Sequence, residues 1–577
     1  MFLPTTQAEV NRLEWDRLDI ILITGDSYID SSFIGVSVIG RVLQNAGYKV
    51  GMIAQPDYNS DVDITRLGEP RLFWGVTAGS IDSMVANYTA TGRPRRLDDY
   101  TPGGRNSKRP NRATLVYANL IRRYFKNTVP IVLGGVEASL RRIAHYDFWS
   151  DAIRRSVLFD AKADYLLYGM AEGSVLELAE TFDKGKSPTK IRGVCYIGKS
   201  IPPNYLELPS FEMVSEDKDT FIEMFHTFYQ NNAPLSAKGL AQRHGDRYLV
   251  QNPPFPYLTQ EELDQVYDLD YERGQHPYYA QQGKVKALET IRFSIPIHRG
   301  CYGECNFCAI AVHEGRTVRW RSEGSILAEA QKITHLPDFK GFIYDLSGPT
   351  SNMYGFECPV KLHQGPCKDK SCLFPETCPS LPVDHNKQTK LLRKLRQIEG
   401  IKKVFVSSGL RYDMLLSDRE HGEEYLKELV EHHISGQMKI APEHAQPEVL
   451  ARMRKPDQSQ LLEFKQRFDA MNKKLGKKQF LSYYLIAAYP GCTQSDMQAL
   501  KRFASHHLGI LPEQVQVFTP TPSTYASVMY YTEKDPFTGE KLFVEKNPAA
   551  KQRQKETITG QHKSPHRYQR KKNAKSK

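Results

Sequence analysis

Hydrophobic residues in the second half of the chain follow two alternating patterns. Short runs rich in β-branched and aromatic residues predict strands, and these cover residues 290–297, 341–346, 403–407, 437–441, 480–487 and 514–519. Apolar residues spaced three and four apart predict helices, near residues 322–335, 386–398, 421–432, 456–473 and 493–507. Six strands that alternate with helices predict a parallel sheet.

The first 200 residues alternate in the same way. Strands are expected at 18–24, 49–54, 72–76, 130–133 and 165–168, with a helix at 35–46. Gly25, Gly134 and Gly169 directly follow three of these strands. Buried parallel strands with glycine at their carboxyl ends are typical of an open, doubly wound α/β sheet, which binds ligands at those ends.

The remaining segments complete a division of the chain into four parts. We expect a Rossmann-like domain in residues 1–200 and a second α/β domain in residues 290–535, with an inserted loop at 353–380. Residues 201–289 are polar and rich in Pro, Tyr and Gln, which predicts an extended connector with a helix near 259–268. Residues 536–577 form a C-terminal extension that ends in a basic tail.

The composition is that of a soluble globular protein. Hydrophobic residues make up 40% of the 577 positions and charged residues 25%, as in ordinary folded domains. The chain has no run of 18 apolar residues, which predicts no spanning helix and no membrane partner. Its start lacks the basic and apolar regions of a secretory signal. We therefore expect a cytoplasmic protein.

The net charge of +12 is concentrated at the C-terminus. Residues 551–577 hold ten basic residues and one acidic residue, Glu556, which leaves +3 for the rest of the chain. The tail lacks periodic apolar positions, so we expect it to be disordered. It would serve either to keep the chain soluble or to contact RNA or another polyanion.

Seven of the nine cysteines lie between residues 301 and 378. An odd number of cysteines in a long chain without an export signal argues against a disulfide framework and favours metal binding in a reducing compartment. Cys301, Cys305 and Cys308 form a C-x3-C-x2-C motif. Thiolates at such short spacings are typical ligands of one iron–sulfur cluster, although buried or zinc-binding thiols are the alternative. Three ligands would leave one iron of a four-iron cluster open to a chelating cofactor.

This motif, with Phe307 just before its last cysteine, resembles the signature of radical S-adenosylmethionine (SAM) enzymes. The resemblance implies a partial (βα)6 barrel of the TIM type, with the cysteine loop after the first strand. It also implies a [4Fe-4S] cluster whose fourth iron is chelated by SAM. One electron, from a reductant such as flavodoxin or ferredoxin, would then cleave SAM to a 5′-deoxyadenosyl radical. That chemistry belongs to the cofactors, while the protein supplies geometry and excludes water.

Three strand ends are candidates for holding SAM, because chemistry in such barrels lies at the carboxyl ends of the strands. Ser347, Gly348 and Pro349 follow the second strand, where the resemblance implies a glycine-rich contact to the amino group of SAM. Residues 407–409 follow the third strand, and residues 441–444 the fourth. Each of these stretches also fits a plain strand-to-helix turn, where Gly, Pro and Ser are common.

A second group of cysteines, Cys358, Cys367, Cys372 and Cys378, lies in the loop after the second strand. Four thiolates can bind structural zinc or an additional iron–sulfur cluster. Their spacings lack the paired C-x2-C units of a zinc ribbon, so the metal stays open, and free thiols are a further alternative. This loop is expected on the catalytic face.

The N-terminal domain resembles the cobalamin-binding domain that precedes the barrel in one class of radical SAM enzymes. The signature there is D-x-H-x-x-G, whose His ligates cobalt. Here Asp30 and Gly35 match, and Ser32 replaces the His. The resemblance thus implies either cobalamin without this ligand or, as we expect, a fold retained without the cofactor.

The nearest resemblance is to the YgiQ family of radical SAM proteins, carried by residues 26–30, 137–142, 144–149 and 345–352 and by the four-cysteine loop. It implies a radical SAM enzyme that acts on an unknown substrate, with methyl or methylthio transfer among the reactions that remain open. The alternative is a protein with a structural or regulatory cluster that associates with RNA through its tail. The nearly balanced charge of the other 550 residues argues against nucleic-acid binding as the main activity.

Overall fold

The N-terminal half of the computed structural model, which describes residues 1–509, 512 and 515–559, is built on a nine-stranded sheet. Five of its strands are parallel neighbours in the order β3-β1-β4-β5-β8. Their bounds are Ile20–Thr24 (β1), Val50–Ala54 (β3), Phe73–Thr77 (β4), Ile131–Leu133 (β5) and Tyr165–Leu167 (β8). In chain order this is a second-first-third-fourth-fifth arrangement, the strand order of flavodoxin-like doubly wound folds.

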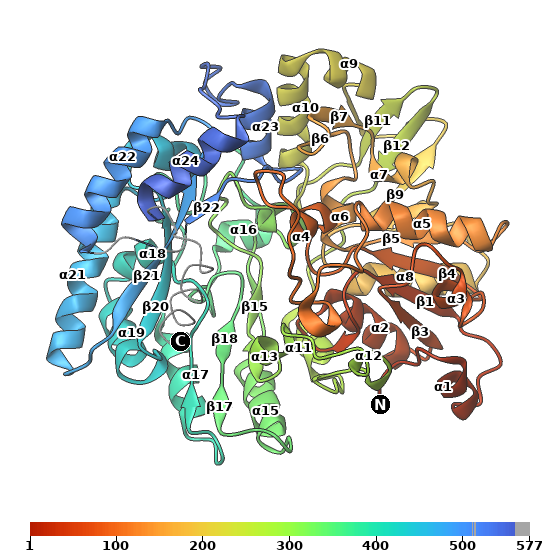
Figure 1. Cartoon of the computed structure of the whole chain (residues 1–577), viewed down its shortest axis with the longest axis horizontal. Helices are drawn as coiled ribbons and strands as arrows, with labels where there is room; N and C mark the ends of the chain where they lie inside the picture. The colour runs from red at the N-terminus through yellow and green to blue at the C-terminus, as the bar shows by residue number, and fades with distance from the viewer. Residues whose placement is uncertain (510–511, 513–514, 560–577) are drawn as a thin grey trace, which may run out of the picture.

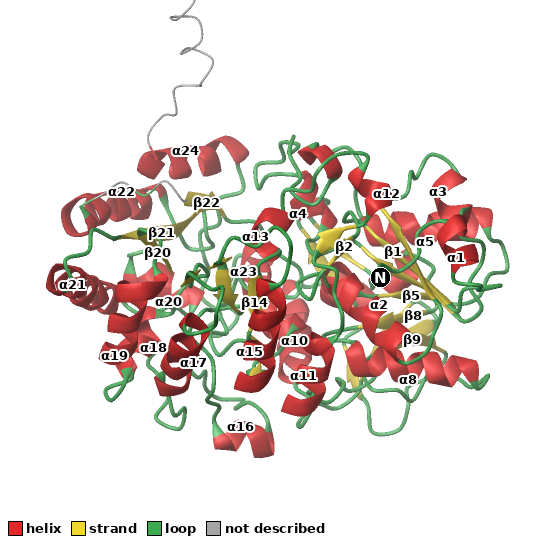
Figure 2. Cartoon of the chain, turned by 90° about the horizontal axis from the view of Figure 1, so that it is seen from below, coloured by secondary structure: helices red, strands yellow, loops and turns green. Residues whose placement is uncertain are grey.

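Helices cover both faces of this sheet because successive strand residues point to opposite sides. Ile20 and Leu22 of β1 pack in one core with residues of α2 (Gly35–Asn45) and α8 (Glu172–Asp183). Ile21 and Ile23 pack in the other core with α5 (Ala113–Tyr124). Figure 2 shows the strands enclosed between helices in this half of the molecule. The predicted doubly wound sheet is therefore confirmed.

Residues 201–289 carry more secondary structure than an extended connector. They contribute β10 (Leu206–Leu208), β11 (Leu240–His244) and β12 (Arg247–Gln251) to the same nine-stranded sheet, next to β9 (Val194–Gly198). Two helices, α9 (Phe211–Glu216) and α10 (Lys218–Gln230), lie between β10 and β11. The expected helix near 259–268 is α11 (Gln260–Asp268). The connector interpretation is corrected to an extension of the first sheet.

The described part of the second half contains parallel strand pairs at all six predicted strand positions, with helices between them, and β17 and β18 together occupy the second position. The strands are β14 (Ser294–Pro296), β17 and β18 (Phe342–Ile343 and Asp345–Ser347), β19 (Lys403–Val404), β20 (Gln437–Glu443), β21 (Phe480–Ala487) and β22 (Val515–Val517). The main helices are α15 (Glu323–Thr334), α17 (Asn386–Arg396), α19 (Gly422–Glu428), α21 (Gln458–Lys474) and α22 (Gln494–Phe503). The first strand is shorter than predicted, because α13 (Leu288–Ile291) occupies its expected start. Figure 1 shows this half, coloured green to blue, beside the red-to-yellow N-terminal half.

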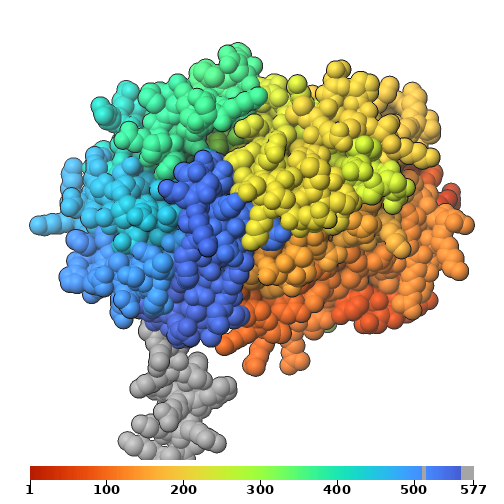
Figure 3. Space-filling view, turned by 90° about the horizontal axis from the view of Figure 1, so that it is seen from above, coloured from red at the N-terminus to blue at the C-terminus, as the bar shows by residue number. Residues whose placement is uncertain are grey.

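The C-terminal segment lies across both halves. After α23 (Tyr525–Thr532), α24 (Pro548–Thr559) packs against α22 and buries Lys551, Gln554 and Ile558. The imidazole of His226 in α10 forms hydrogen bonds with the Tyr525 hydroxyl and the Pro536 carbonyl. In Figure 3 the dark blue surface of this C-terminal segment lies against the yellow and orange surface of the N-terminal half. The first nine residues of the predicted disordered tail are thus helical, and residues 560–577 lie outside the described residues. Among the described residues, helices are all too short or too polar to cross a membrane.

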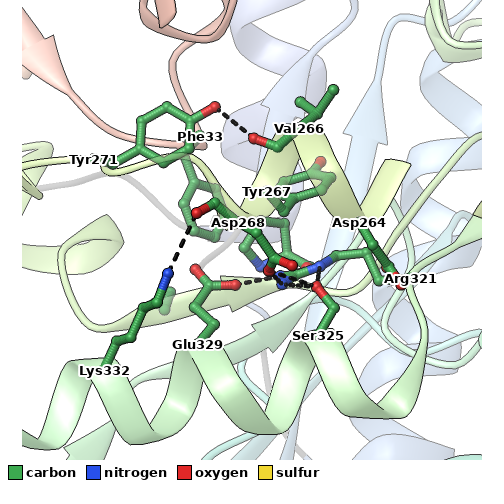
Figure 4. Close-up of polar contacts among 12 residues, drawn as sticks. Phe33, Asp264, Val266, Tyr267, Asp268, Tyr271, Arg321, Ser325, Glu329 and Lys332 are labelled. Atoms are coloured by element: carbon green, nitrogen blue, oxygen red, sulfur yellow. Dashed lines mark hydrogen bonds and ion pairs between the residues drawn. The ribbon is translucent and has the colours of Figure 1, made fainter. Parts of the chain in front are cut away.

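A buried ionic cluster joins α11 and the residues after it to α15 (Figure 4). Arg321 is fully buried, donates to Ser325 Oγ at 2.7 Å and pairs with Glu329. Arg273 pairs with the same carboxylate. Two buried guanidinium groups thus share one buried carboxylate on α15, and the half-exposed Asp268 of α11 lies 3.9 Å from Arg321 and accepts from Ser325 Oγ at 3.0 Å.

Candidate functional site

One cavity of about 1490 Å³ lies between the two halves of the molecule. Its walls include residues at the carboxyl ends of the N-terminal strands, among them Gly79, Gly134 and Gly169. The facing walls come from barrel strand ends, including Ser347 and Glu443. Both folds bind ligands at these ends, so the structure directs the two expected binding edges into a single space.

The cysteine loop follows β15 (His298–Arg299) and is held at its start by hydrogen bonds from the backbone amides of Gly300 and Cys301. The Gly300 amide donates to Glu314 at 3.1 Å, and the Cys301 amide donates to the Gly315 carbonyl at 3.3 Å. Gly300 has φ +81, and a side chain there would overlap the Thr317 carbonyl. Only glycine therefore suits this turn, and it fixes where the first cysteine leaves β15.

Hydrogen-bond donors face two of the three half-buried thiols of this loop. The Gly303 amide donates to Cys301 Sγ at 3.3 Å, and Arg411 Nη1 donates to Cys305 Sγ at 3.6 Å. Asp413 accepts from Arg411 Nε at 2.8 Å and orients the guanidinium. Donors and positive charge at the sulfurs suit the anionic thiolate ligands of an iron–sulfur cluster. The residues present therefore fit the implied [4Fe-4S] group.

Phe307, Ser347, Gly348 and Pro349, the residues predicted to contact SAM, all line the cavity. A side chain at Gly348 would overlap the imidazole of His298, whose Nε2 lies 2.8 Å from the Thr350 carbonyl. Glycine at this position therefore lets the chain after β18 pass directly over His298. The result is a backbone stretch, half-buried at Gly348 and Pro349, that lines the cavity wall beside the cysteine loop.

Backbone amides after the third barrel strand are hydrogen-bonded to a side chain of the second strand. Asp345 accepts hydrogen bonds from the amides of Ser407 and Ser408 at 2.7 and 3.2 Å. These two amides are therefore already engaged, although both serines line the cavity. Their first role is to tie adjacent strand ends together.

Glu443 at the end of β20 is buried at the cavity wall in a strained conformation. Its φ is +67, which L residues rarely adopt, and its carboxylate lies 3.9 Å from Lys455 Nζ. Burial raises the pKa of Glu443 to about 7, against the lowering effect of Lys455 and Arg411. His444 instead points into the protein, where it accepts a hydrogen bond from the Gln446 amide at 3.0 Å.

This raised pKa predicts a pH-dependent stability. The folded state favours the protonated carboxyl, so the associated stability is present below the ordinary pKa of glutamate and is lost as pH rises through about 7. We expect the unfolding free energy of the wild type to fall by about 2.5 kcal/mol relative to Glu443→Gln between pH 5 and pH 8. Chemical denaturation of both proteins at the two pH values measures this difference, and parallel pH curves would contradict it.

The cobalamin-like motif of the N-terminal half lies at the cavity but carries no imidazole at the expected position. Ser32 lines the wall, and its buried hydroxyl has no hydrogen-bond partner in the described part of the chain. Asp30 pairs with Arg41 and accepts from the Glu272 amide at 2.9 Å. These residues do not fit a cobalamin ligated by a His from this motif.

Several residues at the site could not be found from local sequence. Arg299 pairs with Glu172 of the N-terminal half, and its Nε donates to Tyr267 at 2.8 Å. Arg299 and Glu172 both line the cavity, so a buried ion pair crosses from the cysteine loop to the other half. Arg411 is likewise far from the cysteines in sequence. The sequence indicates these two arginines only by their positions next to motifs. Arg299 lies shortly before Cys301, and Arg411 lies shortly after residues 407–409.

The second cysteine group lies beside the cysteine loop rather than in the cavity. Cys358 is buried, and Cys367, Cys372 and Cys378 are half-buried. Of the described residues that line the cavity, none belongs to this group. Cys301, Cys305 and Cys308 are not among those lining residues either, and Cys358 and Cys372 pack with Tyr302 next to Cys301. The position of this loop on the catalytic face stays a prediction.

Comparison with known proteins gives matches along the chain. The family model described as "Radical SAM N-terminal" matches residues 2–294, "Radical SAM superfamily" matches 295–504, and a domain of unknown function (DUF3362) matches 513–575. A UPF0313 protein of Fusobacterium nucleatum is 55% identical over 98% of this chain and 99% of its own length. A UPF0313 protein of Thermotoga maritima is 49% identical over 97% and 98%.

The fold is also similar to that of a solved structure. The cobalamin-dependent S-adenosylmethionine radical enzyme OxsB, with aqua-cobalamin bound, superposes with a TM-score of 0.50 at 11% identity, over 90% of this chain and 56% of that chain. At this identity the likeness concerns the fold alone, and the radical SAM assignment comes from the family models. The chain therefore belongs to the UPF0313 family and is a radical SAM enzyme.

Proposed function

We propose that Cys301, Cys305 and Cys308 bind a [4Fe-4S] cluster and that the adjoining cavity wall binds SAM. The observation that supports this most strongly is the shared cavity, which Phe307, Ser347 and Gly348 line beside the cysteine loop. When bound and reduced, the cluster supplies the single electron that cleaves SAM. A structural cluster would need no such cavity, so the enzyme is favoured over a purely structural role.

The chain's own residues have separate roles in this proposal. Arg411 and the Gly303 amide hold and stabilise the thiolates, while the glycine at 348 leaves its backbone open to SAM. Arg299 and Glu172 fix the cysteine loop against the N-terminal half and help exclude water. The N-terminal part of the cavity, whose wall includes Phe33, Ile34 and Val36, would receive the substrate.

The test is SAM cleavage by the full chain. Protein reconstituted anaerobically with iron and sulfide, and then reduced with dithionite or a flavodoxin-type carrier, should form 5′-deoxyadenosine and methionine from SAM. The absence of 5′-deoxyadenosine, with and without added cell extract as a source of substrate, would overturn the proposal.

Cobalamin is expected not to bind stably, because position 32 offers a hydroxyl where the motif has its cobalt ligand. Purified protein titrated with hydroxocobalamin should retain none after gel filtration. The Ser32→His variant is the matched comparison, since it restores the imidazole and should retain cobalamin with the visible spectrum of a nitrogen-ligated cobalt. Saturable binding by the wild type at micromolar concentration would contradict the expectation and favour methyl transfer.

A further inference from the structure

The four cysteines between residues 358 and 378 border a second buried cluster of side chains next to the first cysteine loop. Tyr302, Cys358, Leu373 and Met414 belong to this cluster, and Cys301 and Cys372 both pack against it. The Tyr302 hydroxyl donates to the Phe356 carbonyl. This bond ties the start of the four-cysteine loop to Tyr302, the residue directly after Cys301. The two cysteine groups are therefore neighbours that share one aromatic side chain.

Hydrogen bonds link the parts of this loop that carry its cysteines. Cys358 stands at the N-terminus of α16 (Pro359–Gln364), from which Lys361 reaches Cys372. The Cys378 amide donates to the Cys372 carbonyl at 2.8 Å and closes the turn between them. These contacts connect three of the four cysteines, and Cys367 is the remaining thiol of the same loop.

A buried ammonium group faces this turn. Lys361 is 1% exposed, and its Nζ lies 3.5 Å from Cys372 Sγ, 3.8 Å from Glu357 and 4.8 Å from the centroid of the Tyr302 ring. Glu357 is also engaged by the amides of Val318 and Cys358, each at 2.7 Å. A cation removed from water requires nearby negative charge; Glu357 supplies one such charge, and the Cys372 sulfur at 3.5 Å is placed to supply a second as a thiolate.

The spacing of the thiols distinguishes between the candidate metals. Tetrahedral zinc with Zn–S bonds of about 2.3 Å brings its sulfurs to about 3.8 Å from one another. Across the ranges that the structure describes, three ligand atoms within 4.8 Å of one another occur only at Asp384, Asp418 and His421. Neither cysteine group is that compact. Wider spacing is what a cluster needs, because each thiolate binds a different iron.

We propose that Cys358, Cys367, Cys372 and Cys378 bind a second iron–sulfur cluster beside Tyr302, with Lys361 balancing its negative charge. This site goes beyond the proposed function, because SAM cleavage needs only the first cluster. Four protein ligands leave no iron open to SAM, so the second cluster stores or relays electrons and does not bind SAM.

The test counts metal in the full chain after anaerobic reconstitution with iron, sulfide and zinc together. Wild-type protein should hold about eight irons, and the triple variant Cys301→Ser, Cys305→Ser, Cys308→Ser should keep about four with matching acid-labile sulfide. A variant with all four loop cysteines changed to serine should keep the other four. Cys492→Ser, an isolated buried thiol, is the control that should keep all eight.

The outcomes separate this inference from the proposed function. One zinc per chain, or no iron in a triple variant that still shows native circular dichroism, would overturn the second cluster, as would about four irons in the wild type. Wild-type protein that holds eight irons but never cleaves SAM would instead overturn the proposed function and leave the second cluster intact. Lys361→Met in the triple variant should lower the reduction potential of the remaining cluster, since a neighbouring positive charge is lost.

Discussion

Alanine in place of Cys301, Cys305 or Cys308 is expected to abolish the formation of 5′-deoxyadenosine from SAM. Each thiolate would bind one iron, and its loss leaves that iron without a protein ligand. Changes to residues that only support metal ligands typically reduce activity by 10–100-fold, so loss of a ligand itself should reduce it by about 100-fold or more. The measurement is the rate of 5′-deoxyadenosine formation by anaerobic, reduced protein.

Cys492→Ala is the matched control for these variants. Cys492 is buried, and its Sγ contacts His444 Nε2 at 3.6 Å, the Thr493 carbonyl and Gln554. Its replacement removes a thiol of similar burial without touching the proposed cluster, so the rate should stay close to that of the wild type. A variant of the three-cysteine motif that kept the wild-type rate would remove that cysteine from the site.

The parts of the fold that sequence predicts well are those specified by neighbouring residues. β1, β3 and β4 are five-residue runs of largely apolar residues that are buried almost throughout. The barrel strands alternate with helices whose apolar positions repeat every three or four residues. The cysteine motif is local as well, since eight consecutive residues contain all three thiols.

The strands of residues 201–289 escaped prediction because their burial is set by the partner strand. β11 and β12 pair as a hairpin that carries Gln242, His244 and Gln251 as buried polar residues. Helix α24 was missed for a similar reason. Two of its buried residues are Lys551 and Gln554, and Lys551 Nζ is satisfied by a hydrogen bond to Tyr530 at 2.8 Å. Polar residues at buried positions give no hydrophobic period to detect.

The site shows the same division between local and distant information. Ser347, Gly348 and Pro349 could be proposed from sequence because they directly follow a strand. Arg411 meets Cys305 only because two strand ends of the barrel converge, and Glu172 meets Arg299 only because the two halves pack together. Contacts over 106 and 127 positions depend on the tertiary fold, and no pattern of spacing encodes them.

Glu329→Gln is expected to destabilise the protein by about 3–5 kcal/mol, the typical effect of removing one partner from a buried ion pair. The carboxylate of Glu329 is 5% exposed and pairs with both Arg321 and Arg273. Burial lowers the pKa of each arginine to about 10, so both remain charged at neutral pH. A neutral amide in place of the carboxylate would leave Arg273 without its ion-pair partner and Arg321 with only the half-exposed Asp268 at 3.9 Å.

Glu323→Gln on the same helix provides the control. Glu323 pairs with Lys394, but both side chains are more than a third exposed, and an ion pair of this kind contributes about 1 kcal/mol or less. Chemical denaturation of the wild type and both variants at pH 7 measures the unfolding free energies. We expect Glu329→Gln to unfold at clearly lower denaturant concentration than Glu323→Gln. Equal loss in the two variants would show that the packing of Arg273 and Arg321 against α15 does not depend on this carboxylate. The guanidinium of Arg321 would then be held by its other partners, which are Ser325 Oγ, the Pro296 carbonyl at 3.0 Å and Asp268 at 3.9 Å.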